Sequence, residues 1–154
     1  KIPIMIFINK CDREGKDAFD LMDELEDSLT IYGRIIDTDY YDLLIAKITS
    51  QGLSKRVSFI TDCTNIQNEL RAFKYALHTS LKETGPLVLI EYLAHNLPFL
   101  SFNTGQVYQT IGKDLPEFFI DTFNKIDWIT KLKSLSLVDS SRIKKVNENR
   151  AIVK

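Results

Sequence analysis

The chain has few of the residues that bind metals or attack substrates, with only two cysteines and two histidines among 154 residues. Cys11 and Cys63 lie far apart and do not match the ligand spacing of a zinc site. This leaves little material for zinc binding or for catalysis by a Cys–His or Ser–His pair. We therefore expect no metal, no cofactor, reduced thiols in a cytoplasmic protein, and chemistry based on carboxylates, lysines and backbone amides.

The sequence also lacks an excess of either charge, since 20 Lys and Arg residues balance 21 Asp and Glu residues. A surface that binds nucleic acid needs a clear basic excess to neutralise phosphates, so no nucleic-acid partner is expected. No apolar run approaches the ~20 residues that span a bilayer, and no signal-peptide pattern is present. Because the chain begins at Lys1, on the edge of an apolar segment, we interpret it as a domain of a longer protein.

Glycine and proline are scarce, with six and four residues, and they fall almost entirely between the predicted helices and strands. Strands are predicted at 2–8, 29–32, 57–60, 75–78, 99–102 and 118–120, and helices at 17–28, 40–51, 66–73, 87–95, 106–111 and 126–135. Such alternation is typical of an α/β fold with a parallel sheet. We predict a Rossmann-like three-layer α/β/α domain with about six strands over residues 1–138, whose ligand lies at the carboxyl ends of the strands.

The C-terminal segment 139–154 differs in composition from the rest of the chain. From Ser141 onward it contains five basic residues and a single acid, Glu148. We predict a basic, solvated tail. Its charges could contact a membrane surface, although they lack the apolar stripe of an interfacial helix.

One loop and the helix after it combine features that suit an anionic ligand. Gly85 and Pro86 open the helix predicted at 87–95, whose first backbone amides are unpaired and attract negative charge. Glu91 lies about one turn into this apolar helix. Burying its carboxylate is costly unless a hydrogen-bond donor, such as a ribose diol, meets it. The alternative is that Glu91 lies on a solvated stripe of the helix.

Residues 76–98 resemble the donor-binding block of retaining glycosyltransferases of the GT-B architecture, of the group 1 or family 4 type. Glu83 and Glu91, separated by seven residues, match the paired-glutamate motif of that family. Residues 29–33 and 52–59 look like its preceding strands, so the resemblance covers roughly residues 29–135. It implies one half of a GT-B fold, which would help to move a sugar from a nucleoside diphosphate to an acceptor hydroxyl in polysaccharide or glycan assembly. The implied partners are the nucleoside-diphosphate sugar and an N-terminal acceptor domain of the same parent chain.

The resemblance also implies roles for individual residues. Glu83 would face the hydroxyls of the donor sugar as a catalytic residue, and Glu91 would hold the ribose diol. The residues implied to lie at the sugar and the diphosphate are Thr84, Gly85, Pro86, Leu87, Thr104 and Gly105. Thr61 follows the third predicted strand, where the family holds the nucleobase. The chain departs from the family at Asn96, usually glycine, and at Gln106, often glutamate, which leaves the identity of the sugar open.

The first 28 residues have two interpretations. The run 9–12, Asn-Lys-Cys-Asp, is the guanine-recognition motif of GTPases, and residues 3–27 resemble bacterial release-factor GTPases. A GTPase also needs a Gly-x-x-x-x-Gly-Lys-Ser/Thr phosphate loop, which this sequence lacks, so a guanine-nucleotide-binding fragment is the alternative. In the glycosyltransferase interpretation Lys10 would clamp the diphosphate as a catalytic residue, with Arg13 or Lys16 as a second basic contact. Such positive groups stabilise a departing diphosphate without a metal.

Overall fold

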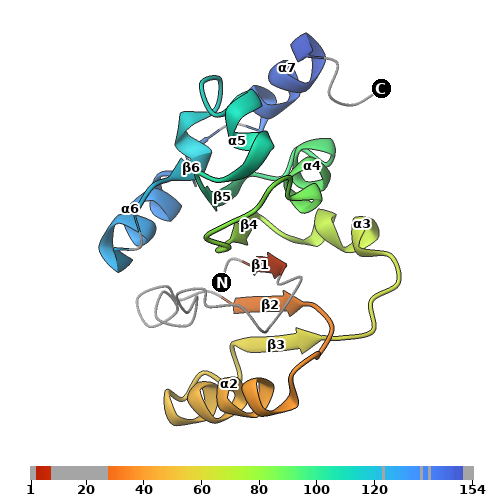
Figure 1. Ribbon diagram of the computed structural model, residues 1–154, viewed down its shortest axis with the longest axis vertical. Coiled ribbons are helices and arrows are strands. Elements are labelled where there is room, and N and C mark those ends of the chain that lie inside the picture. The colour runs from red at the N-terminus through yellow and green to blue at the C-terminus, as the bar shows by residue number, and fades with distance from the viewer. Residues whose placement is uncertain (1–2, 8–27, 123, 136, 139, 151–154) are drawn as a thin grey trace.

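The computed structural model describes residues 3–7, 28–122, 124–135, 137–138 and 140–150, and the structure is discussed for these residues alone. Six parallel strands form one sheet in the order β3-β2-β1-β4-β5-β6 (Figure 1). Their bounds are β1 Pro3–Phe7, β2 Ser28–Tyr32, β3 Val57–Ile60, β4 Tyr75–His78, β5 Phe99–Phe102 and β6 Phe119–Ile120. The predicted strands match these within one residue at each end, and the Rossmann-like α/β fold is confirmed.

The order of the strands reverses direction once, between β1 and β4. The chain runs outward from β1 through β2 to β3, returns to place β4 beside β1, and then continues to β5 and β6. In this register Ile4 lies opposite Tyr75, and Ile6 opposite Leu77. With the right-handed connections that parallel strands almost always have, such a reversal puts helices on opposite faces of the sheet.

Helices connect the strands, beginning and ending close to the predicted positions. The described helices are α2 Thr38–Ser50, α3 Ile66–Glu69, α4 Leu87–Ala94, α5 Gly105–Ile111, α6 Lys125–Leu135 and α7 Ser141–Arg150. The helix predicted at 66–73 is instead a single α turn followed by the 3-10 helix η1, Leu70–Ala72. The helix predicted at 17–28 lies outside the described residues. Within the described part of the chain, no helix has the length and apolar character needed to cross a membrane.

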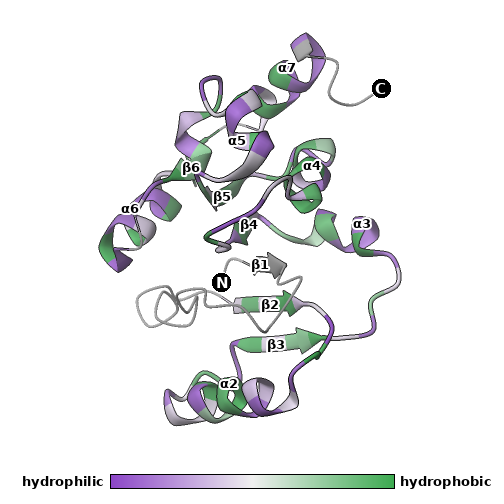
Figure 2. Ribbon diagram, viewed as in Figure 1, coloured by the Kyte–Doolittle hydropathy of each residue, from purple (hydrophilic) through white to green (hydrophobic). Residues whose placement is uncertain are grey.

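Strands β4 and β5 are almost completely buried. An aromatic cluster packs at β5, where Phe99 contacts the rings of Tyr92, Phe118 and Phe119 at centroid distances of 5.3–6.0 Å. Figure 2 shows that β2, β3 and α4 consist largely of apolar residues, whereas α7 is mainly polar. Strands covered on both faces carry continuous apolar runs for this reason.

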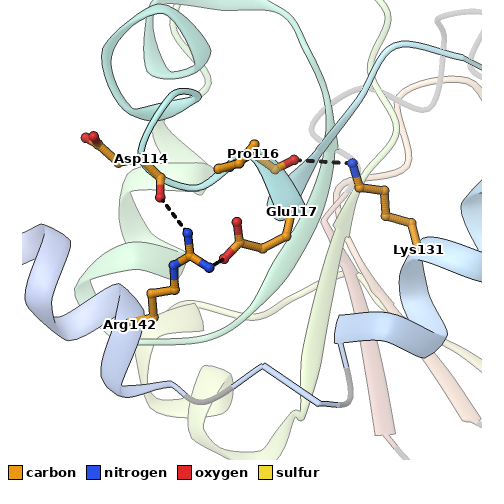
Figure 3. A network of polar contacts seen from close by, with 5 residues as sticks. All are labelled: Asp114, Pro116, Glu117, Lys131 and Arg142. Atoms are coloured by element: carbon orange, nitrogen blue, oxygen red, sulfur yellow. Dashed lines mark hydrogen bonds and ion pairs between the residues drawn. The ribbon is translucent and has the colours of Figure 1, made fainter.

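The predicted solvated tail is wrong for residues 141–150, which form helix α7 and pack against α4. Ile143 is completely buried, and the side-chain amide of Asn147 donates to the Leu93 carbonyl at 2.7 Å. Arg142 points toward Glu117 and forms an ion pair at 2.8 Å with it (Figure 3). The amphipathic stripe that α7 buries is narrow, so its overall composition resembles that of a solvated segment.

Helices α2 and α4 end in the same way, with a left-handed residue directly after the C-cap. This residue is Gly52 after α2, with φ 69°, and Asn96 after α4, with φ 53°. At the C-terminal end of α4, the amide of Asn96 donates to the Leu93 carbonyl and the amide of Leu97 donates to the Tyr92 carbonyl, at 2.9 Å each. These two bonds define a Schellman motif, which favours glycine and next asparagine at the left-handed position. The departure at Asn96 therefore keeps the geometry that a glycine would give.

Candidate functional site

The loops after β4 and β5 lie at the carboxyl ends of the strands. Strand β4 is one of the two strands between which the strand order reverses. Open α/β sheets bind ligands in the crevice outside the strand ends at such a point. The loop after β4, residues 79–86, carries Glu83 and leads directly into α4. The short loop after β5, residues 103–104, leads into α5. Five of the residues predicted to lie at the donor therefore belong to two neighbouring loops.

Glu83 is half-buried and is held at both its main chain and its side chain. The Ser80 hydroxyl donates to Glu83 Oε1 at 2.9 Å. The Glu83 amide donates to Thr104 Oγ1 at 3.2 Å, which joins the loop after β4 to the loop after β5. Among the described residues Glu83 forms no ion pair, so its second carboxylate oxygen remains available to a ligand.

Gly105 brings the two loops into direct backbone contact. Its φ of 75° is left-handed, and a Cβ at this position would lie 2.9 Å from both the Glu83 carbonyl oxygen and Pro86 Cδ. Next to it, the Gln106 amide donates to the Thr84 carbonyl at 2.9 Å. The structure thus brings together Glu83, Thr84, Gly85, Pro86, Thr104 and Gly105, as the sequence suggested.

Helix α4 begins beside these loops. Pro86 is the N-cap rather than the first helical residue, and its carbonyl accepts a bond from the Leu89 amide at 3.1 Å. The amides of Leu87 and Val88 precede the first intrahelical bonds and lie at the positive end of the helix dipole. No acidic residue occupies this first turn. The helix start is therefore suited to an anion.

Glu91 lies on the partly exposed face of α4 rather than in the core. Its neighbours on that face, Leu87 and Ile90, are 73% and 39% exposed. The opposite face is buried and consists of Val88, Leu89, Tyr92 and Leu93. The structure thus favours the solvated-stripe alternative for the placement of Glu91. A partly exposed carboxylate one turn above the helix start is still accessible to a ligand.

His78 is the last residue of β4 and is buried, with 5% of its surface exposed. Its Nδ1 lies 3.1 Å from the Ser101 hydroxyl, which itself donates to the Phe102 carbonyl at 2.9 Å. The Ser101 hydroxyl therefore links the His78 ring to the main chain of β5. Burial lowers the pKa of His78, and the negative charge of Glu83 acts in the opposite direction.

Thr61 is exposed in the loop after β3 and does not contact the Glu83 loop. Strand β3 lies three strand spacings from β4, about 14 Å, so only an extended ligand could meet both loops. Lys10, Arg13, Lys16 and the 9–12 motif lie outside the described residues. Within the described part of the chain, no cluster of three or more His, Cys, Asp or Glu residues could hold a metal ion.

A hollow of about 170 Å³ lies beside the edge strand β6, next to the loop after β5. It is lined by Asn103, Tyr108, Gly112, Pro116, Phe119, Ile120, Asp121 and Lys131. The Lys131 ammonium donates to the Pro116 carbonyl at 3.2 Å (Figure 3) and to the Phe119 carbonyl at 2.7 Å, so two of its three donors are used within the protein. None of the predicted site residues lines this hollow.

Comparison with known proteins identifies the family. The sequence profile described as "Glycosyl transferases group 1" matches residues 16–150. The chain belongs to the group 1 glycosyl transferases. This match includes both the 79–86 loop and helix α7. Among curated proteins, no sequence matches the chain significantly.

Solved structures of glycosyltransferases share the fold. A glycosyltransferase from Rickettsia africae is 16% identical, with a TM-score of 0.78 over 96% of this chain and 41% of that chain. The C-terminal domain of the group 1 protein LpcC from Francisella tularensis is 22% identical, with a TM-score of 0.71 over 97% of this chain and 82% of that one. HepE from Anabaena, in complex with UDP and glucose, is 15% identical, with a TM-score of 0.73 over 92% of this chain and 40% of its own. The chain therefore spans about two fifths of the first and third of these structures.

Proposed function

We propose that this chain is the donor-binding domain of a retaining glycosyltransferase that takes its sugar from a nucleoside diphosphate. The acceptor is a hydroxyl of a growing polysaccharide or other glycan, supplied across a cleft by a second domain. The observation that carries this proposal is the junction of the 79–86 loop with Thr104 and Gly105 beside the start of α4. The UDP and glucose bound to HepE, which has the same fold, support the same class of ligand.

Each group at this junction has a part in the proposed reaction. The Glu83 carboxylate accepts hydrogen bonds from hydroxyls of the donor sugar, and Glu91 accepts them from the ribose diol. The amides of Leu87 and Val88 meet the diphosphate, which also lies near Thr104 and Gly105. The sugar becomes oxocarbenium-like as the diphosphate departs, so fixed dipoles and cations at the leaving group lower the barrier. Lys10, with Arg13 or Lys16, supplies the cations in this proposal.

The proposal includes a cytoplasmic location and no requirement for a metal, both inferred from the sequence. Excess chelator should leave the transferase activity of the parent enzyme unchanged, because the positive field comes from side chains and helix amides. Loss of activity that manganese restores would contradict this part of the proposal.

A thermal-shift panel tests donor binding. The ligands are UDP, GDP and ADP together with their glucose, galactose and N-acetylglucosamine esters. A ligand at one hundred times its dissociation constant adds ~2.7 kcal/mol to the stability of the folded state. In a domain of this size each kcal/mol raises the melting temperature by ~2–4 °C, so a shift of roughly 5–10 °C is expected. The absence of a shift with every ligand would overturn the proposal.

Two variants make the panel specific. Glu91→Gln should reduce the shift because the neutral amide is a weaker acceptor for the ribose diol. Glu148→Gln, on the exposed surface of α7, is the matched control and should leave the shift unchanged. Under the guanine-nucleotide alternative, Asp12→Ala would abolish the shift with GDP, and Glu91→Gln would not affect it.

A further inference from the structure

The serine three residues before Glu83 is in contact with the carboxylate proposed to face the donor sugar. Ser80 Oγ donates to Glu83 Oε1 at 2.9 Å, and both side chains are partly buried. The sequence gives Ser80 no function of its own. Because the 79–86 loop is neither helix nor strand, this contact depends on the loop geometry and does not follow from the spacing alone.

Two different constraints act on Glu83. The Thr104 hydroxyl holds the main chain of Glu83, because it accepts from the Glu83 amide at 3.2 Å and donates to the Glu83 carbonyl at 3.5 Å. Gly105 packs closely against the same carbonyl. Ser80 alone, among the described residues, holds the carboxylate itself. A glutamate side chain has three rotatable bonds, so a fixed main chain leaves the position of a half-exposed carboxylate undetermined.

The contact also decides what the carboxylate offers to a ligand. A carboxylate is an acceptor only, with two oxygens and about four lone-pair directions. Ser80 occupies one direction on Oε1, which leaves Oε2 and the other side of Oε1 for the hydroxyls of a sugar. A carboxylate fixed in this way accepts hydroxyls from particular directions, and therefore distinguishes sugars in which one hydroxyl is equatorial or axial.

We infer that Ser80 is a positioning residue that fixes the Glu83 carboxylate and thereby sets which donor sugar is accepted. This inference rests on the proposed function, because it takes the ligand of Glu83 to be the sugar of a nucleoside-diphosphate sugar. Ser80 acts on the sugar end of the ligand alone. The diphosphate and the nucleoside are held by other groups.

The test compares affinities for a nucleoside diphosphate and for its glucose and galactose esters, measured by calorimetry on the purified protein. UDP, UDP-glucose and UDP-galactose are the probes, replaced by the GDP or ADP series if the wild type binds that nucleotide best. The variants are Ser80→Ala, Ser80→Thr, which keeps the hydroxyl, and Ser134→Ala. Ser134 also donates a hydroxyl, to the Lys131 carbonyl on α6, and serves as the matched control.

Ser80→Ala should weaken binding of the preferred sugar nucleotide about five- to tenfold, as expected for the loss of one ordinary hydrogen bond. It should bring the affinities for the two epimers closer together and leave that for UDP within about twofold. Ser80→Thr should restore the preference, and Ser134→Ala should match the wild type.

Equal weakening of UDP and UDP-glucose in Ser80→Ala would overturn the inference, because Ser80 would then only stabilise the loop. An unchanged preference between the epimers, or no preference in the wild type, would also overturn it while leaving the proposed function intact. If the wild type bound none of the nucleotides, the proposed function would fail, and the inference would fail with it.

Discussion

Gly105 and Gly52 have similar backbone angles in different surroundings. Comparing them distinguishes a glycine required by its left-handed φ alone from one that is also required by close packing. Both have positive φ, 75° and 69° respectively. A Cβ on Gly105 would collide with the Glu83 carbonyl and Pro86, whereas a Cβ on Gly52 would meet nothing within 4 Å. Gly52→Ala should therefore cost only the left-handed strain, about 1–2 kcal/mol.

Gly105→Ala should cost the same strain and also separate the two loops of the candidate site. We expect a larger loss of unfolding free energy, about 2–4 kcal/mol, and weaker binding of nucleotide sugars. Denaturant unfolding of both variants measures the difference. Equal losses for Gly105→Ala and Gly52→Ala would show that the two loops are not in the close contact described.

His78 should make the stability of the domain depend on pH below neutrality. Burial lowers its pKa in the folded state below the ordinary value of about 6.5. As the pH falls through about 6.5, the unfolded chain binds a proton at this residue and the folded chain does not, so stability decreases. The slope contributed by one such group reaches at most about 1.4 kcal/mol per pH unit.

Urea unfolding between pH 7.5 and pH 5 measures this effect, above the range in which most carboxylates titrate. His78→Gln should flatten the profile in this window, because glutamine does not bind a proton. A variant with the same pH dependence as the wild type would show that burial does not lower the pKa of His78 in the folded state below its value in the unfolded chain.

The residues of the candidate site differ in how far the sequence could predict them. Gly85, Thr104 and Gly105 were predicted to lie near one ligand, and the structure brings their loops together. Glu91 was expected either against a ligand diol or on a solvated stripe. The structure places it on a partly exposed face, and its contact with a diol stays a prediction. The contact of Ser80 with Glu83 could not be predicted, because it depends on the path of an irregular loop.

At the scale of elements, the apolar patterns predicted most of the described helices and strands. β3, β4 and β5 begin and end where expected, since each is a short apolar run between turn residues. Helix α7 was missed because its core contact is small, consisting mainly of Ile143, Val146 and Asn147. Those three residues share one helix face by their spacing of three and four, a signal that the surrounding charges obscured.

Asn147 should be the residue that fixes α7 to α4. Its side-chain amide donates to the Leu93 carbonyl at 2.7 Å and lies 3.4 Å from Asn96 Oδ1, at the C-terminal end of α4. Asn147→Ala should lower the free energy of unfolding by about 1–2 kcal/mol, through the lost bonds of a buried amide. Amide hydrogen exchange in residues 141–150 should become faster.

Asn149→Ala is the matched control, because Asn149 is exposed on the same helix and has the same helix propensity as Asn147. It should change neither stability nor exchange by a comparable amount. Similar effects of the two variants would mean that α7 is held by helix propensity rather than by its contact with α4.

At the scale of the whole molecule, the order of the strands could not be derived from the pattern of apolar residues. That pattern predicted a parallel sheet, but several orders of six parallel strands bury the same residues. The observed order places β4 beside β1 and therefore places the Glu83 loop at the point of reversal. The location of the candidate site is thus a consequence of long-range topology, whereas each of its two loops is a short contiguous segment of the sequence.

The last prediction concerns what residues 1–154 do by themselves. They should bind a nucleoside diphosphate or its sugar ester, since Glu83, Glu91, the two loops and the start of α4 all belong to this chain. They should not transfer the sugar, because the acceptor and the group that deprotonates it are expected from a second domain. Proximity and orientation contribute ~7–11 kcal/mol to two-substrate reactions, and one side of a cleft does not position both substrates.

The measurement combines the thermal shift with a radiolabelled-donor assay on the same preparation, with added glycan acceptors. Binding without transfer is the expected result, and measurable transfer by these residues alone would refute the two-domain interpretation.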